Sequence, residues 1–353
     1  MRLIDIGERR LISDLLRTRY AANTWRFGDD TAVVLDGERL GGGRLVATTD
    51  PAPEPAAWAH GGFDWYYFGW LTAALNLSDI AAAGAVPAGL LTSFVLSSDL
   101  SVAKFERLLD GVDDCCASVG TKVLGGNLKE GDTHCSATAF GVVPSGEPLS
   151  RHGAAPGHTI FAIGDTGYFW AGMLAFDNSL TLPGDERAAL FDALLKPVPR
   201  VAVGRALQSR GLVAACTDNS DGLYGSLWCL TQSNGLGVIV EPEHMQYQGI
   251  VTRIAERYGH DPLRLALGFG DLQLVCAVAP ERVAELLELC SAEGWGVFRV
   301  GTVTDRPGFH LEGEAGPVEL LNLDNERFTY ESQFTGGLDG YRKRLLEGPI
   351  TKS

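Results

Sequence analysis

Several features that define common protein classes are missing from this 353-residue sequence. No apolar run approaches the roughly 20 residues of a membrane-spanning helix. Charged residues also interrupt the apolar ones at the N-terminus, so we expect neither membrane insertion nor a signal peptide. The seven cysteines form no CxxC pair, which favours reduced, mostly buried thiols in a cytoplasmic protein. The pattern GxxxxGKS/T is absent as well, so a P-loop is excluded.

Basic residues are few relative to acidic ones. The chain has 29 Lys and Arg against 44 Asp and Glu, a formal net charge of -15. Binding to a phosphate backbone needs clustered Lys and Arg, so we expect no nucleic-acid partner. An acidic enzyme can still act on phosphates when divalent cations lie between its carboxylates and the substrate. The charge balance therefore favours a cation-dependent enzyme if phosphates are handled at all.

Helical and strand-like segments alternate along the chain, which indicates a mixed α/β (α+β) fold. The length suits two domains, and the Pro-, Gly- and Ser-rich segment 144–158 is typical of a domain junction, so we predict domains at 1–147 and 148–353. Asp64 is the expected N-cap of a helix that ends at 76–79. The other expected elements are strands at 32–35, 45–49, 122–124, 135–143, 159–163, 237–240 and 272–278, and helices at 13–21, 101–120, 186–195, 201–208 and 281–292.

Aspartates gather with Gly, Ser, Thr and Asn at the predicted ends of strands and helices. The groups are Gly28-Asp29-Asp30, Thr48-Thr49-Asp50, Asn76-Leu77-Ser78-Asp79 and Asp218-Asn219-Ser220-Asp221-Gly222. Mg²⁺ prefers oxygen ligands and usually takes one or two carboxylates together with water and phosphate oxygens. Asp beside Gly, Ser or Asn is also common in turns and caps. A single motif is therefore unspecific, whereas several converging motifs would form a metal site.

Taken together, the motifs resemble the thiamine-monophosphate kinase family, part of the superfamily of aminoimidazole ribonucleotide synthetase, hydrogenase maturation factor and selenophosphate synthetase. Residues 76–87, NLSDIAAAGAVP, resemble the family signature NLSDIAAMGA-P and are the most specific match. Residues 28–33 resemble GDDAAV, 48–50 match TTD, 151–158 resemble R-SGA-PGD, 197–200 resemble P-PR, and 218–223 resemble DISDGL. The resemblance extends over about residues 5 to 345.

This resemblance implies an N-terminal domain that shares a β-barrel with its twin in a homodimer, and a ferredoxin-like α+β C-terminal domain. It implies ATP bound near the dimer and domain junction and in-line phosphoryl transfer to a small molecule, with Mg²⁺ neutralising charge. The implied Mg²⁺ ligands are Asp30, Asp50, Asp79, Asp218 and Asp221. The implied catalytic residues are Asp79, Asp221 and Asn127, and the implied nucleotide contacts are Asp29, Thr48, Thr49, Gly126, Arg151 and Ser220.

The sequence departs from the family pattern at three places. Asn127 stands where the family motif GGDT has an aspartate, so a charged ligand becomes a neutral amide. Segment 51–60, a possible lid, lacks the histidine of the GVHF motif at the matching offset, and 268–275 and 337–341 match GGEDYELLF and GWDHF only in part. Three readings remain open: a thiamine-monophosphate kinase, a divergent relative that phosphorylates or activates another small molecule, and a nucleotide-binding protein without catalysis.

Overall fold

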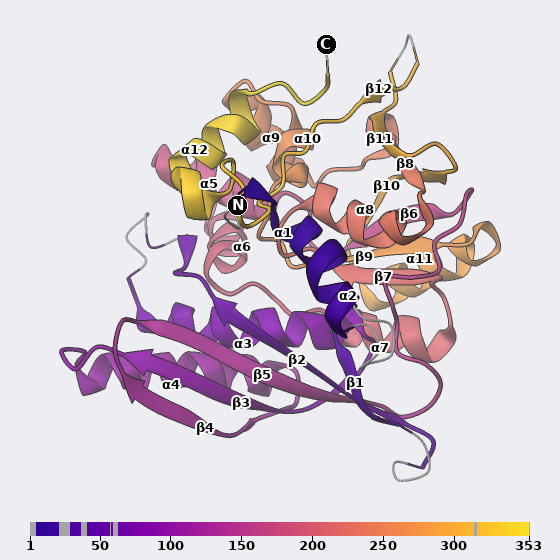
Figure 1. Ribbon diagram of the computed structural model, residues 1–353. Coiled ribbons are helices and arrows are strands. Elements are labelled where there is room, and N and C mark those ends of the chain that lie inside the picture. The colour runs from indigo at the N-terminus through magenta and orange to yellow at the C-terminus, as the bar shows by residue number, and fades with distance from the viewer. Residues whose placement is uncertain are drawn as a thin grey trace. The chain divides into compact units, whose positions relative to one another are not determined.

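The computed structural model describes residues 5–20, 29–36, 41–56, 58, 63–313 and 316–352 (Figure 1). The chain divides into two compact units. Unit 1 consists of Met1–Asp29, Leu149–Asn178 and Gly211–Ser353, and unit 2 of Asp30–Pro148 and Ser179–Arg210. Compared with a single cut after residue 147, residues 1–29 join the C-terminal unit and residues 179–210 join the N-terminal unit. The domain boundaries 1–147 and 148–353 stay a prediction.

Unit 2 contains a five-stranded sheet with strand order β1-β2-β5-β3-β4, in which β3 and β4 are parallel and the other pairs antiparallel. Its strands are β1 (Ala32–Asp36), β2 (Arg44–Ala52), β3 (Val86–Leu96), β4 (Val123–Glu130) and β5 (His134–Val143). Its helices are α3 (Trp65–Ala82), α4 (Val102–Ser118), α6 (Gly184–Leu195) and α7 (Val201–Arg210). Figure 1 shows α3 and α4 running alongside this sheet.

Helix α3 is the central helix of unit 2. The predicted N-cap is confirmed, because the Asp64 side chain accepts a hydrogen bond from the Tyr66 backbone N–H. A Cβ atom at Gly69 would lie 1.9 Å from the Leu108 carbonyl oxygen, and one at Gly111 would lie 1.9 Å from that of Tyr66. Helices α3 and α4 therefore pack backbone against backbone, which leaves no room for a side chain at either glycine.

The expected end of this helix at 76–79 is wrong, because α3 continues to Ala82. The Asn76 side chain donates to the Thr72 carbonyl oxygen within the helix instead of ending it, and the helical residues Ile80–Ala82 follow before Gly84, whose φ is +68°. The glycines Gly125 and Gly126 likewise lie inside β4 rather than after it, because their pairing with β3 continues to Glu130.

Unit 1 contains a seven-stranded sheet with strand order β12-β11-β8-β10-β6-β9-β7. Every residue of β6 and β9 is buried, so these strands form the centre of the core. The strands are β6 (Thr159–Ile163), β7 (Ala215–Asp218), β8 (Gly237–Val240), β9 (Leu274–Val278), β10 (Val297–Thr304), β11 (Gly308–Leu311) and β12 (Val318–Glu319). The α-helices are α1 (Glu8–Arg10), α2 (Arg17–Tyr20), α5 (Tyr168–Asp177), α8 (Leu223–Thr231), α9 (Gly249–Arg257), α10 (Pro262–Leu267), α11 (Val283–Glu293) and α12 (Gln333–Glu347), and a π-helical turn, Leu11–Leu16, joins α1 to α2.

The sequence suggested buried thiols and no membrane-spanning helix, and the structure bears on both expectations. None of the seven cysteines, all of which lie in the described ranges, forms a disulfide, and six of them are buried. Burial raises the pKa of the Cys116 and Cys135 thiols to about 12, so these groups are neutral and unreactive at physiological pH. None of the helices in the described ranges combines the length and the apolar character that a membrane crossing requires.

Candidate functional site

Asp79 occupies the most unusual position among the predicted site residues. It is only 8% exposed and lies in the last turn of α3, which contains no basic residue. The Thr48 hydroxyl of β2 donates a hydrogen bond of 2.6 Å to its Oδ2 atom. A helix C-terminus carries partial negative charge, so a buried carboxylate there is electrostatically costly. A bound divalent cation would offset that cost.

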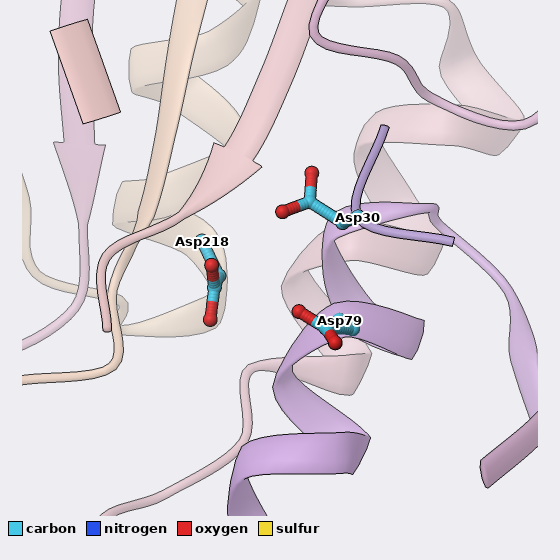
Figure 2. A group of neighbouring side chains, drawn as sticks. All are labelled: Asp30, Asp79 and Asp218. Carbon is cyan, nitrogen blue, oxygen red and sulfur yellow. The ribbon is translucent and has the colours of Figure 1, made fainter. Parts of the chain in front are cut away.

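Asp30 is the neighbour of Asp79 within unit 2. It lies two residues before the first residue of β1, and one of its carboxylate oxygens is within 4.8 Å of one from Asp79 (Figure 2). Two oxygens that share one Mg²⁺ lie at most about 4 Å apart, so only a small side-chain movement separates this pair from a shared ion. Asp50 does not join the pair at that distance in the described part of unit 2.

The TTD and NLSD motifs are joined through their polar side chains. The Asn76 side chain accepts from the Asp50 backbone N–H at 2.9 Å and donates to the Asp50 carbonyl oxygen at 3.2 Å, so it fixes β2 to α3. Successive strand residues point to opposite faces. Thr48 contacts Asp79, whereas the Thr49 hydroxyl bonds the Ala137 carbonyl oxygen and the residue is exposed. The structure therefore brings Thr48, but not Thr49, to Asp79.

Gly126 and Asn127 lie on β4, the edge strand of the unit 2 sheet, and both are exposed. Asn127 pairs with Ser93 of β3, and a Cβ atom at Gly126 would lie 2.2 Å from the Thr92 carbonyl oxygen. Only glycine fits at position 126 without a shift of the backbone. Asn127 is therefore an exposed residue on a strand whose backbone is closely packed against β3.

In unit 1, Asp29 holds the loop that follows residue 148. Its Oδ1 atom accepts hydrogen bonds from the Ser150 hydroxyl at 3.1 Å and the Arg151 backbone N–H at 2.9 Å. The Arg151 guanidinium donates in turn to the Thr217 hydroxyl of β7 at 3.2 Å. These contacts connect two predicted nucleotide-contacting residues, Asp29 and Arg151, with the strand that carries Asp218. The preceding residue Gly28 lies outside the described residues.

Asp218 ends β7 and is 7% exposed. The turn after it is held by neighbouring side chains: the Ser226 hydroxyl donates to the Asp218 carbonyl oxygen at 3.1 Å. The Asn219 amide donates to the Gln273 side chain at 3.1 Å. Ser220 and Asp221, which follow, are partly exposed. The turn is thus rigid at its start and open to solvent at its end.

Arg327 is a neighbour of Asp221 that sequence reasoning missed. Its Nη1 atom lies 3.5 Å from Asp221 Oδ2 and 3.4 Å from Glu8 Oε1. Burial raises the pKa of Glu8, and the nearby Asp221 charge adds to this effect, while Arg327 opposes it. Arg327 stands in an irregular segment, 322–331, that contains no recognisable motif, so no local signal marked it.

In residues 268–275, which resemble GGEDYELLF in part, two side chains form hydrogen bonds within unit 1. The Asp271 carboxylate accepts hydrogen bonds from the backbone N–H groups of Gly167 at 2.6 Å and Phe169 at 2.8 Å, at the start of α5. Gln273 donates to the Asp165 carbonyl oxygen and the Thr166 hydroxyl. In the possible lid at 51–60, residues 57, 59 and 60 lie outside the described residues, so the lid stays a prediction.

Comparison with known proteins agrees with this pattern of motifs. Residues 28–143 match the N-terminal domain, and residues 155–314 the C-terminal domain, of the AIR synthase related proteins. The thiamine-monophosphate kinase of Halobacterium salinarum is 31% identical over 82% of this chain and 92% of its own length. That of Synechococcus elongatus is 28% identical over 91% of this chain and 96% of its own length.

Solved structures show the same relationship. The structure of AaThiL complexed with AMPPCP and TMP matches with a TM-score of 0.75 and 27% identity, over 89% of this chain and 96% of that chain. The similarity therefore extends through both matched domains and is not confined to the acidic motifs. On the identity and coverage of these relatives, the chain belongs to the thiamine-monophosphate kinase family.

Proposed function

We propose that this protein transfers the γ-phosphate of ATP to thiamine monophosphate, yielding thiamine diphosphate and ADP. The observation that carries the proposal is the buried Asp79 at the C-terminal end of α3, beside Asp30, in a segment that resembles the family signature. The AaThiL structure, which holds AMPPCP and TMP, supports both the nucleotide and the acceptor. In-line phosphoryl transfer requires positioning and charge neutralisation, so no serine or histidine nucleophile is needed.

Magnesium suits the residues present. Asp30 and Asp79 offer hard carboxylate oxygens, and we propose Asp50, Asp218 and Asp221 as further Mg²⁺ ligands on their motifs. The ion would supply charge neutralisation on the phosphate oxygens. Thr48 orients the Asp79 carboxylate through its 2.6 Å hydrogen bond. Asp29, Thr49, Gly126, Arg151 and Ser220 are the proposed nucleotide contacts, with Asp79, Asp221 and Asn127 the proposed catalytic residues.

A second candidate function is phosphorylation or activation of another small molecule at the same ATP site. Two observations favour it: the neutral Asn127 where the family has an aspartate, and the altered 268–275 segment, whose Asp271 and Gln273 are used in internal hydrogen bonds. A protein that binds nucleotide without turnover is the remaining alternative. Both alternatives retain the ATP site. In the first, ATP phosphorylates or activates another small molecule, and in the second, ATP is bound but not consumed.

We also propose a cytoplasmic homodimer in which the N-terminal domains share a β-barrel, and a ferredoxin-like arrangement in the C-terminal domain. The edge strand β4 supports the dimer, because seven of its eight residues are exposed, including Leu124 and Leu128. An exposed strand edge with apolar side chains is a favourable surface for pairing with another chain. Light scattering of the purified protein tests the dimer, which a monomeric mass would contradict.

The deciding experiment is an assay with ATP, Mg²⁺ and thiamine monophosphate that follows thiamine diphosphate by mass. We expect product that disappears when the cation is chelated or when thiamine replaces its monophosphate. ATP binding without thiamine diphosphate would favour the second candidate function and direct the search to other acceptors. Absence of both ATP binding and product would contradict every reading that retains the nucleotide site.

A further inference from the structure

Unit 1 contains a hollow that is separate from the predicted site residues described above. It has a volume of about 440 Å³ and lies between the N-terminal segment and residues 322–331. We call it the aromatic hollow; the residues that define it here are Arg9, Tyr224, Trp228, Phe328 and Tyr330. Its volume is within the roughly 300–1,000 Å³ range of small-molecule sites.

The guanidinium of Arg9 forms a fixed, flat cationic surface in this hollow. Its Cζ atom lies 5.8 Å from the ring centroid of Tyr224 and 5.2 Å from that of Trp228. The Asp324 carboxylate, whose side chain is fully buried, and Glu326, at 2.8 Å, hold its edges. Because two carboxylates fix the group in its plane, little side-chain freedom is left to lose when a ligand stacks on it.

Two large aromatic side chains stay exposed at the hollow. Tyr330 is 60% exposed and Phe328 is 43% exposed. Phe328 has a φ of +58°, a conformation that non-glycine residues rarely adopt and that often accompanies function. The segment is nevertheless pinned, because the Glu8 backbone N–H donates to the Arg327 carbonyl oxygen at 3.1 Å. Exposed rings on a strained but fixed backbone are typical of a binding surface.

The hollow adjoins a proposed phosphate-handling residue of the same unit. Arg327 stands between two of its lining residues, Glu326 and Phe328, and its guanidinium lies 3.5 Å from Asp221. The segment that lines the hollow is thus the one that carries the arginine beside Asp221. Aromatic rings and arginine planes bind heteroaromatic rings by stacking.

We propose that the aromatic hollow binds a planar, nitrogen-containing aromatic ring of a phosphate-bearing ligand, stacked on Tyr330 and on the guanidinium face of Arg9. The position of the phosphate rests on the proposed function, whereas the ring site rests on the hollow itself. ATP and thiamine monophosphate both carry such a ring, so the shared chemistry is assigned here and the occupant is left to experiment.

The test compares Tyr330→Ala with Tyr330→Phe, which keeps the ring, in calorimetric titrations with Mg²⁺ present. The probes are ATP, thiamine monophosphate and tripolyphosphate, which has no ring. We expect Tyr330→Ala to weaken the ring-bearing occupant about tenfold, as loss of one stacking partner does, and to leave tripolyphosphate unchanged. Tyr330→Phe should bind like the wild type. Unchanged melting temperatures show that the variants fold.

Each outcome decides between the sources of the ring. A loss confined to ATP places the nucleotide base in the hollow, and a loss confined to thiamine monophosphate places the acceptor ring there. Wild-type affinity for both, or an equal loss for tripolyphosphate, would overturn the proposal. A ring-dependent loss without phosphoryl transfer in the wild type would reject the proposed function alone, and transfer without that loss would reject the hollow alone.

Discussion

In unit 2 the carboxylate of Asp79 accepts a hydrogen bond from a hydroxyl, whereas in unit 1 an arginine lies beside the carboxylate of Asp221. Asp79 accepts from the Thr48 hydroxyl, and the backbone of Asp50 is bonded to the Asn76 amide. Asp221, by contrast, lies 3.5 Å from the Arg327 guanidinium. A hydroxyl fixes a carboxylate without cancelling its charge, whereas a guanidinium opposes that charge.

The burial of these residues follows the same division. Asp79 is 8% exposed, and the Asp221 side chain is 30% exposed. Coulomb interactions strengthen as solvent is excluded, so a cation beside Asp79 would be bound more strongly than one beside Asp221. We therefore expect the proposed metal ligand Asp79 to bind a cation more strongly than the proposed ligand Asp221.

The largest expected effect is on catalysis by Asp79→Asn. We expect turnover with ATP and Mg²⁺ to fall about a thousandfold, because a buried carboxylate that is proposed to hold the charge-neutralising Mg²⁺ is lost. Asp221→Asn should cost less, about tenfold, since Arg327 already balances part of its charge. The initial rates of both variants measure the difference, with the exposed Asp113→Asn as a control at the wild-type rate. Equal losses at both positions would break the comparison between the units.

The next effect concerns the helix packing that supports Asp79. Gly111→Ala would place a Cβ atom 1.9 Å from the Tyr66 carbonyl oxygen and force α4 away from α3. We expect the free energy of unfolding to fall by about 3 kcal/mol, as overpacked interiors do. Urea unfolding measures it. The control is Gly184→Ala in α6, where a Cβ atom would meet nothing within 4 Å, so wild-type or slightly higher stability is expected.

If Gly111→Ala unfolded at the same urea concentration as the wild type, the rigid support of α3 would be disproved. A loss of stability shared by Gly184→Ala would also count against the packing explanation. Of these two glycines, only Gly111, where the backbones of α3 and α4 meet, should lose stability on substitution by alanine.

The smallest effect tests a carboxylate that unit 1 holds by ionic contacts. Glu241 accepts hydrogen bonds from the Thr302 hydroxyl at 2.6 Å and from Arg299 at 2.8 Å. Burial raises its pKa, but the hydrogen bonds from Thr302, His244 and Arg299 outweigh burial and hold the pKa of Glu241 below its ordinary value of 4.5. Glu241→Gln should therefore lower the free energy of unfolding by about 2 kcal/mol at neutral pH.

The sign of the pH dependence follows from that depressed pKa. The stabilisation by Glu241 is complete above its unfolded-state pKa and is lost as the pH falls through the folded-state pKa. Thermal unfolding of wild type and Glu241→Gln should thus differ most near neutral pH and converge as the pH falls below the ordinary pKa of 4.5 and through the lowered folded-state pKa. The exposed pair of Glu285 with Arg282 provides the control, because Glu285→Gln should change stability by at most about 0.5 kcal/mol. A difference that persists in acid would contradict this account.

The elements that sequence patterns predicted well are those with strong local signals. The continuous apolar runs at 159–163 and 237–240 match β6 and β8, and Asp64 caps α3 as expected. Strand β3 was not expected, although it lies between β5 and β4 in the sheet. It begins inside the signature, at Val86, and its residues show no clear alternation, so only pairing on both sides reveals the strand.

The sequence alone determined the family and the identities of the acidic residues, because these are carried by short motifs whose residue types and order can be read directly. Tertiary structure alone decided what each residue contacts. Asn76 is 26 positions from Asp50, and Asp29 is 122 positions from Arg151, yet each pair is joined by hydrogen bonds. No local periodicity encodes contacts at such separations, since they form only when packing brings distant segments together.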